Sequence, residues 1–157
     1  MSPSQPKPLP TRHEGPSESP GFLLWRISNS WQREQRAALQ PLGLTHTQFV
    51  MLAVATWFGA QEPLTQARLS QLTGSDPMTT SQVVRTLLAN GLFVREIHPT
   101  DTRAKIISVS EAGRDIAQKA IVVVEEVDRR FFAALGEQQS SLVGLFQTLL
   151  EQRHHTD

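Results

Sequence analysis

Apolar residues recur every three or four positions along most of the chain after residue 20, a spacing typical of helices that bury one face. The first such stretch spans residues 21–40 and stops at Pro41 and Gly43. Its apolar positions are Phe22, Trp25, Ile27, Trp31 and Leu39. The second begins at Thr45, which forms a T-x-x-Q capping box with Gln48, and ends at Gly59. Its apolar positions are Phe49, Leu52, Ala53 and Trp57.

A short helix and a strongly capped helix come next. Residues 66–72 have the spacing of a short helix, and residues 73–75, Thr-Gly-Ser, predict a turn. Asp76 then supplies an N-cap and Pro77 the first helical position of another helix, which Gly91 ends. Its apolar positions are Val83, Val84, Leu87 and Leu88.

The apolar spacing changes from 3.6 to 2 after Gly91. Residues 92–98 and 104–109 are rich in β-branched and aromatic types, and residues 99–103 between them have turn chemistry. The pattern therefore predicts a two-stranded hairpin. Because a lone hairpin is marginal in water, we expect it to pack on the preceding helices.

Two more helices follow the hairpin. Ser110 is the N-cap of a long helix that we expect to end at Gly136. Its apolar positions are Ala117, Ala120, Ile121, Val124, Val127, Phe131 and Leu135. The last helix repeats apolar residues at i, i+3, i+4, i+7 and i+8, namely Leu142, Leu145, Phe146, Leu149 and Leu150. The fold class is therefore mainly α with a small β-hairpin (α+β).

Six of the ten prolines fall within residues 1–20, which contain a single aliphatic residue, Leu9, after the initiator Met. A segment of this composition cannot bury enough apolar surface to offset its ordering entropy, so we expect a disordered tail. Residues 21–152 are expected to form a single domain, and residues 153–157 a frayed C-terminus.

Composition narrows the classes of function. The sequence has no cysteine, which excludes disulfides, thiolate metal ligands and thiol redox switching. Its apolar runs are too short to span a bilayer, and the Pro-rich start lacks a signal-peptide apolar region, so we expect a soluble cytoplasmic protein without a membrane partner. Fifteen basic residues balance fifteen acidic ones, which taken alone argues against a nucleic-acid partner.

The order of elements over residues 45–110 nevertheless matches a winged helix–turn–helix. Residues 64–110 hold five basic and three acidic residues, whereas residues 111–157 hold five basic and eight acidic ones. Positive charge is therefore concentrated, weakly, on the segment expected to meet DNA.

Two sets of side chains are candidates for direct DNA contact. The capped helix opens with short hydroxyl and amide residues, where a recognition helix contacts base edges; the expected major-groove contacts are Thr79, Thr80, Ser81, Gln82 and Arg85. The hairpin tip carries Arg103, a cation placed to enter a narrow minor groove, and Asp101 is expected to orient it by a bidentate pair. The alternatives are a solvated polar helix face and a surface ion pair on a loop.

The segment DPMTTSQVVRTLLANGLFVREIHPTDTRAKIISVSEAGRD resembles the recognition helix, wing and following helix of the MarR family of bacterial transcription regulators, with its D-x-R-A-K wing and S-E-A-G helix start. LTHTQFVMLAV is similar to the family's second helix. The resemblance covers about residues 21–152. It departs from the family pattern at Leu88-Ala89 and at Arg68-Leu69-Ser70, where members often carry acidic residues.

This resemblance implies a homodimeric repressor, with residues 21–40 and 111–152 forming the dimer contact. It also implies a pseudo-palindromic operator in double-stranded DNA. The implied dimer contacts are Phe22, Trp25, Leu142, Leu145, Phe146 and Leu149. Arg95 and Lys105 are assigned to phosphates. The resemblance also implies a small aromatic or anionic effector, whose pocket residues would be Trp25, Arg26, His46, Phe49 and Trp57; ordinary core packing is the alternative.

Other classes of function have less support. No spacing suggests a catalytic triad, a metal site or a nucleotide-binding loop, so we expect no enzyme activity, cofactor or metal. The His154-His155 pair is interpreted as solvated terminus. The main alternative is a dimeric winged-helix module for protein interaction without DNA binding, which the zero net charge supports and Arg103 with Lys105 opposes.

Overall fold

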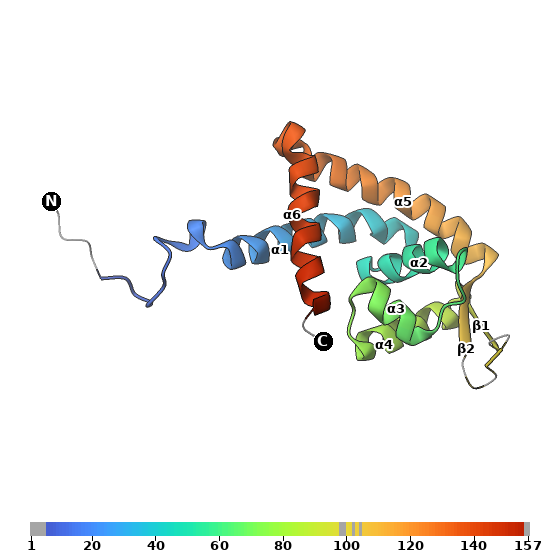
Figure 1. The fold of residues 1–157 in the computed structure, drawn as a ribbon. Helices are drawn as coiled ribbons and strands as arrows, with labels where there is room; N and C mark the ends of the chain where they lie inside the picture. Colours follow the sequence, from blue (N-terminus) through green and yellow to red (C-terminus); the bar gives the residue numbers. More distant parts are fainter. Residues whose placement is uncertain (1–5, 98–99, 102, 104, 156–157) are drawn as a thin grey trace.

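The computed structural model describes residues 6–97, 100–101, 103 and 105–155. Two long helices, α1 (Pro20–Leu39) and α5 (Glu111–Phe132), pack against each other, and a lobe of three shorter helices and a β-hairpin lies to one side of them (Figure 1). The elements are α1 (Pro20–Leu39), α2 (His46–Gly59), α3 (Gln66–Thr73), α4 (Pro77–Ala89), β1 (Phe93–Ile97), β2 (Lys105–Val109), α5 (Glu111–Phe132) and α6 (Gln139–Glu151). Short 3₁₀ turns span Pro16–Glu18, Gln40–Leu42, Ala133–Gln138 and Gln152–His155.

Side-chain caps set the starts of the helices in the lobe. Thr45 and Gln48 form the expected reciprocal capping box at α2. Thr65, Asp76 and Ser110 each accept a hydrogen bond from the backbone N–H three residues on. These contacts satisfy donors that a helix start otherwise leaves unpaired, which explains why local sequence sets these boundaries.

The core lies where α2 meets α3, α4, α5 and the hairpin. It is almost entirely aliphatic, and its fully buried members include Leu39, Met51, Leu52, Leu64, Leu69, Val84 and Leu87. Between α1 and α5 the contact is partly polar, because Asp128 Oδ1 accepts hydrogen bonds from Trp31 Nε1 (2.7 Å) and Gln35 Nε2 (2.9 Å). This network anchors the lobe's long flanking helices to each other.

The hairpin is antiparallel, with its register running from Phe93 opposite Val109 to Ile97 opposite Lys105. Leu64 adds a single-residue bridge to Ile107 on the other side of β2, and its carbonyl accepts the Ile107 N–H at 2.7 Å. The sheet itself has two strands, and this bridge gives β2 a backbone contact on its second edge that the sequence did not predict.

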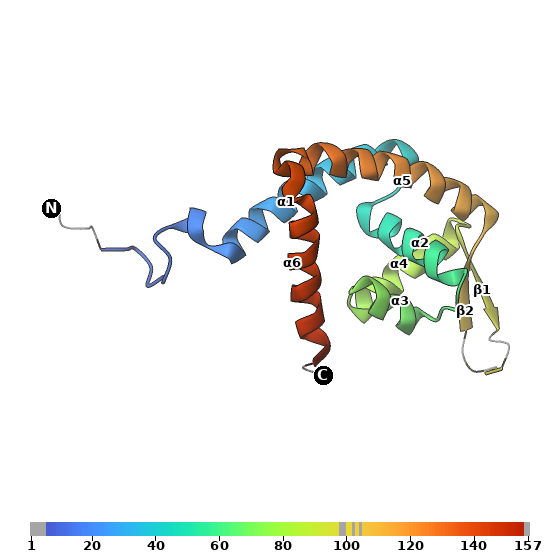
Figure 2. The same ribbon diagram turned by 45° about the horizontal axis from the view of Figure 1, so that its top comes forward.

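The last helices differ most from expectation. α5 ends at Phe132 rather than at Gly136, and Gly136 instead adopts a positive φ of 55° within a 3₁₀ turn that redirects the chain. α6 leaves the end of α5 across the direction of α1 and α5 (Figure 2). None of its residues is buried in the single chain.

Smaller differences concern element ends and the termini. α1 begins at Pro20 because the Ser19 hydroxyl accepts the Phe22 N–H, and Thr73 belongs to α3 rather than to the turn after it. Residues 98, 99, 102 and 104 of the predicted hairpin lie outside the described residues. In the part of the chain that the structure describes, no helix is both long and apolar enough to cross a membrane.

Candidate nucleic-acid interface

The exposed face of α4 is a narrow stripe along the helix. Gln82, Arg85 and Thr86 are exposed on it, whereas Val84 and Leu87 are fully buried on the opposite face. Residues spaced by three, four or seven positions share a helix face, so the stripe follows from the 3.6-residue period. α4 packs on α2, α3 and β1, which leaves this stripe as its solvent side.

The hydroxyl groups at the start of α4 are engaged within the helix cap. Thr79 Oγ1 donates to Asp76 Oδ2 at 2.7 Å, and Thr79 N donates to Asp76 Oδ1 at 2.8 Å. These two hydrogen bonds hold the pKa of the Asp76 carboxyl below its ordinary value of 3.8. Thr80 is fully buried, and its hydroxyl donates to the Asp76 carbonyl at 2.9 Å.

The expected contact between Thr80 and a base edge is therefore wrong, because its side chain lies on the packed face of α4. Thr79 and Ser81 are half-buried at the edges of the stripe. One exposed side chain of this region was not among the sequence candidates: Met78, which is 73% exposed. The helical period, applied from the buried positions outward, would have found it.

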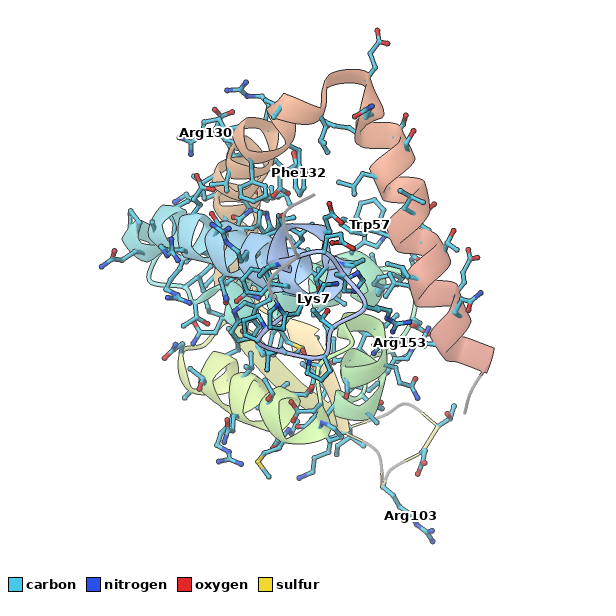
Figure 3. The ribbon with its side chains drawn as sticks, turned by 90° about the vertical axis from the view of Figure 1, so that its left-hand side faces the viewer. Lys7, Trp57, Arg103, Arg130, Phe132 and Arg153 are labelled. Carbon is cyan, nitrogen blue, oxygen red and sulfur yellow. The ribbon has the colours of Figure 1, made fainter. Side chains whose placement is uncertain are left out.

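The hairpin presents cations beyond the packed lobe. Arg103 is exposed at the tip and points away from the body of the molecule (Figure 3). Asp101 Oδ1 accepts the backbone N–H of Arg103 at 3.1 Å, so the carboxylate orients the tip through the main chain. The guanidinium–carboxylate pair expected for these two residues stays a prediction beside this backbone contact.

Arg95 and Lys105 are both exposed on the hairpin. Arg95 lies opposite Ile107, and Lys105 lies opposite Ile97. Because cross-strand partners and residues two apart share a face, both cations lie on one face of the hairpin and Glu96 lies on the other. The two phosphate candidates are thus on the same side of the wing.

The five residues expected to form an effector pocket are not gathered in one cavity. Trp25 on α1 and Trp57 on α2 are 66% and 70% exposed, Arg26 is also exposed, and Phe49 is buried in the core. His46 instead packs edge-on against Trp31, with ring centroids 4.9 Å apart, and stacks on Phe49 at 6.4 Å. Burial lowers the pKa of His46, while the Asp128 carboxylate raises it and Arg36 lowers it.

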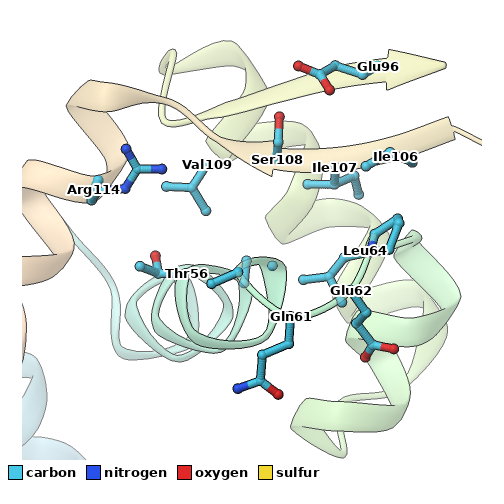
Figure 4. Close-up of a pocket in the computed structure, with 14 residues that line it drawn as sticks. Thr56, Gln61, Glu62, Leu64, Glu96, Ile106, Ile107, Ser108, Val109 and Arg114 are labelled. Carbon is cyan, nitrogen blue, oxygen red and sulfur yellow. The ribbon is translucent and has the colours of Figure 1, made fainter. Parts of the chain in front are cut away.

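Surface cavities border the lobe, and two of them adjoin α2. An apolar one of about 720 Å³ lies between α2 and α5 and is lined by Ala53, Val54, Trp57, Phe58, Ala117 and Ile121, among others. A second, of about 480 Å³, lies beneath β2 and is lined partly by Thr56, Gln61, Glu96, Ser108 and Arg114 (Figure 4). Among the described residues, no group of three His, Asp or Glu side chains could hold a metal ion.

The residues assigned to a dimer contact are largely exposed in the single chain. Phe22 and Trp25 on α1 are 43% and 66% exposed, and on α6 Leu145, Phe146 and Leu149 are exposed while Leu142 is half-buried. Neighbouring apolar side chains are exposed too, among them Leu24, Ile27, Val143 and Leu150. Apolar surface of this extent is typical of an interaction interface.

A helix pair with an exposed stripe, followed by a hairpin with cations at its tip, defines the winged helix–turn–helix class of transcription regulators. The MarR family model matches residues 44–105, which run from just before α2 to the first residue of β2. The chain belongs to the MarR family of DNA-binding transcription regulators.

An uncharacterized HTH-type transcriptional regulator of Bacillus subtilis, YdcH, is 39% identical over 140 residues, which are 88% of this chain and 95% of the relative. The HTH-type transcriptional repressor Rv2887 of Mycobacterium tuberculosis is 33% identical over 73% of this chain and 81% of its own length. Its complex with DNA superposes with a TM-score of 0.63 over 83% of this chain and 97% of that one, at 29% identity. CouR of Rhodococcus jostii, bound to p-coumaroyl-CoA, is 26% identical with a TM-score of 0.78, over 92% of this chain and 98% of that one.

Proposed function

We propose that this chain is a homodimeric repressor that binds a pseudo-palindromic DNA site with α4 in the major groove and the hairpin tip in the adjacent minor groove. The observation that carries the proposal is the exposed stripe of α4, on which Gln82 and Arg85 face solvent while the opposite face is packed on the lobe. An amide and a guanidinium are the groups that read adenine and guanine edges in bidentate fashion.

The remaining DNA contacts follow from the positions of the other polar groups. Arg103 enters the minor groove, and Arg95 and Lys105, on one face of the hairpin, contact phosphates. Thr79 and Ser81, at the edges of the stripe, lie nearer the sugar–phosphate backbone than the bases. The complex of Rv2887 with DNA is a precedent for duplex binding in a relative of this chain.

Dimerisation accounts for the exposed apolar residues of α1 and α6. A two-fold dimer buries the same patch on both subunits and places two copies of α4 about one helical turn, roughly 10 base pairs, apart. Because each half-site is read by one protomer, the operator is expected to be pseudo-palindromic. Repression fits the description of the relative Rv2887 as a repressor.

The effector in this proposal is a small aromatic anion. CouR has been solved with p-coumaroyl-CoA and Rv2887 with salicylic acid, both of which carry an aromatic ring and negative charge. In this chain the apolar cavity beside Trp57 and Ile121 offers a surface for such a ring. Of the pocket residues expected from the sequence, Trp57 alone lines it.

The decisive experiment is selection of bound duplexes from random or genomic DNA, followed by affinity measurement on the selected site at several salt concentrations. We expect a two-fold-related consensus, nanomolar-range binding and a loss of affinity as salt rises. Absence of salt-dependent binding to any duplex would overturn the proposal and favour a protein-interaction module.

A further inference from the structure

α4 exposes one large apolar side chain within its otherwise polar stripe. Met78, the second residue of the helix, is 73% exposed, whereas the chain's other described methionine, Met51, is fully buried in the core. Met78 is spaced four residues from Gln82 and seven from Arg85, so the three share the outward face. An exposed thioether at the N-terminal end of this stripe gains nothing from the fold of the single chain.

Met78 is the side chain of the first turn of α4 that is best placed to reach outward, because the hydroxyl groups of its neighbours are engaged within the protein. Thr79 is held by its hydrogen bonds to Asp76, and Thr80 points into the core. Recognition helices contact base edges with their N-terminal residues, and Met78 lies in that turn. Its three rotatable bonds also let it adjust to the base edge that it meets.

We propose that Met78 contacts the C5-methyl group of a thymine in each half-site, and so specifies that base pair. Thymine is the one base that presents a methyl group in the major groove, while the other edges present donors and acceptors. A thioether supplies no strong donor or acceptor, so placing it on a polar base edge removes water without replacing its hydrogen bonds. This inference rests on the proposed DNA-binding function and assigns a specificity residue within it.

The test uses the full chain and its selected duplex, with each thymine replaced singly by deoxyuridine, which lacks only the methyl group. Removing one buried methyl group should weaken wild-type binding about fourfold at one position in a half-site, and roughly fifteenfold when both half-sites are changed. Met78→Ala should bind the thymine duplex more weakly and show no further loss at that position. All other thymines should behave alike in the two proteins.

Two further arms separate base reading from a structural effect. Replacing the sensitive thymine by cytosine should weaken wild-type binding, and 5-methylcytosine should restore part of the loss because it returns the methyl group. Met78→Leu, which stays apolar, should keep the sensitivity to deoxyuridine. Binding to random duplex should be unchanged in both variants, because Met78 carries no charge to contact phosphate.

The outcomes distinguish this inference from the function on which it rests. If wild type and Met78→Ala lose the same affinity at every deoxyuridine position, Met78 does not read thymine although DNA binding stands. If the wild-type protein binds no duplex at all, both the proposed function and this inference fall.

Discussion

Asp76 joins the turn after α3 to the start of α4 through hydrogen bonds from Thr79 and Thr80. Its carboxylate accepts from the backbone and the hydroxyl of Thr79, and its carbonyl accepts from the Thr80 hydroxyl. The side chain therefore fixes the first turn of the helix whose exposed stripe is proposed to meet DNA. Capping by a carboxylate also opposes the positive end of the helix dipole.

Asp76→Ala should lower the melting temperature at pH 7 by roughly 2–4 °C, since it removes both side-chain hydrogen bonds of the cap. Asp76→Asn, which keeps an acceptor, should lose less. The pKa of Asp76 is depressed in the folded chain, so its contribution is present above the ordinary value of 3.8 and lost as pH falls through the folded value. The difference in melting temperature between wild type and Asp76→Ala should therefore be smaller at pH 3 than at pH 7. An undiminished difference at pH 3 would mean that the carboxylate charge is not what stabilises the cap.

Arg103→Ala is expected to weaken specific binding by at least roughly tenfold, because it removes a charged donor from a groove where water is displaced. Fluorescence anisotropy with the selected duplex measures the effect. Lys119→Ala is a matched control, since Lys119 is an exposed cation on α5 and not on α4 or the hairpin. Equal affinities for Arg103→Ala and wild type would remove the wing from the DNA contact.

For single residues, the sequence predicts which chemical groups lie at the start of α4 better than it predicts which of them face solvent. The hydroxyls near the start of α4 were expected to face bases because they lie in the first turns of a recognition helix. Which of them faces outward depends on the phase of the helix against its core, and Thr80 falls on the buried side. Met78 is the reverse case. An apolar residue is ordinarily assigned to the core, whereas this one is exposed.

The hairpin and α5 are joined by a close approach at Gly113. A Cβ at this position would overlap the Leu92 carbonyl oxygen and would lie 2.9 Å from Val109 Cγ1. The Ser110 hydroxyl, which caps α5, also donates to the Gly91 carbonyl at 2.6 Å. The glycine in the S-E-A-G segment thus allows the wing to be seated directly on the start of α5.

Gly113→Ala should reduce the free energy of unfolding by about 1–3 kcal/mol, because the backbone of Leu92 must move to admit the methyl group. Urea denaturation at fixed protein concentration measures this. Gly59→Ala serves as its control, since a Cβ there would meet only Leu64 Cδ1 at an ordinary 3.7 Å. The prediction fails if the two substitutions change the unfolding midpoint equally.

The elements that could be predicted from sequence are those whose ends are set locally. Caps such as Thr45 and Ser110 act over three residues, so the helix starts after them were predicted correctly. The bridge from Leu64 to Ile107 depends on tertiary packing and has no periodic signal of its own. The early end of α5 likewise lacks a cap, because the chain passes into a 3₁₀ turn before reaching Gly136.

The dimer is expected to form through α6, because none of the residues of α6 is buried within its own chain. Leu145 and Leu149 lie one turn apart on its apolar stripe and are 63% and 65% exposed. Leu145→Glu with Leu149→Glu should yield a monomer at micromolar concentration, since four charges would enter a two-fold interface. Sedimentation velocity measures the mass, and Gln147→Glu, on the opposite side of α6, should remain dimeric. A double variant that stays dimeric would move the interface elsewhere.

The whole molecule has no net charge, so its attraction to DNA must come from a few placed cations rather than from a general field. A dimer doubles every such contact. Arg95→Ala or Lys105→Ala should each remove two phosphate contacts from the complex and flatten the slope of log affinity against log salt by about 1.8. Because phosphates carry no sequence information, the loss should be equal on selected and random duplex, unlike that of a base-reading residue. Affinities measured at several salt concentrations between about 50 and 200 mM give this slope. Lys119→Ala should leave the slope unchanged, and an unchanged slope in the wing variants would place the phosphate contacts outside the hairpin.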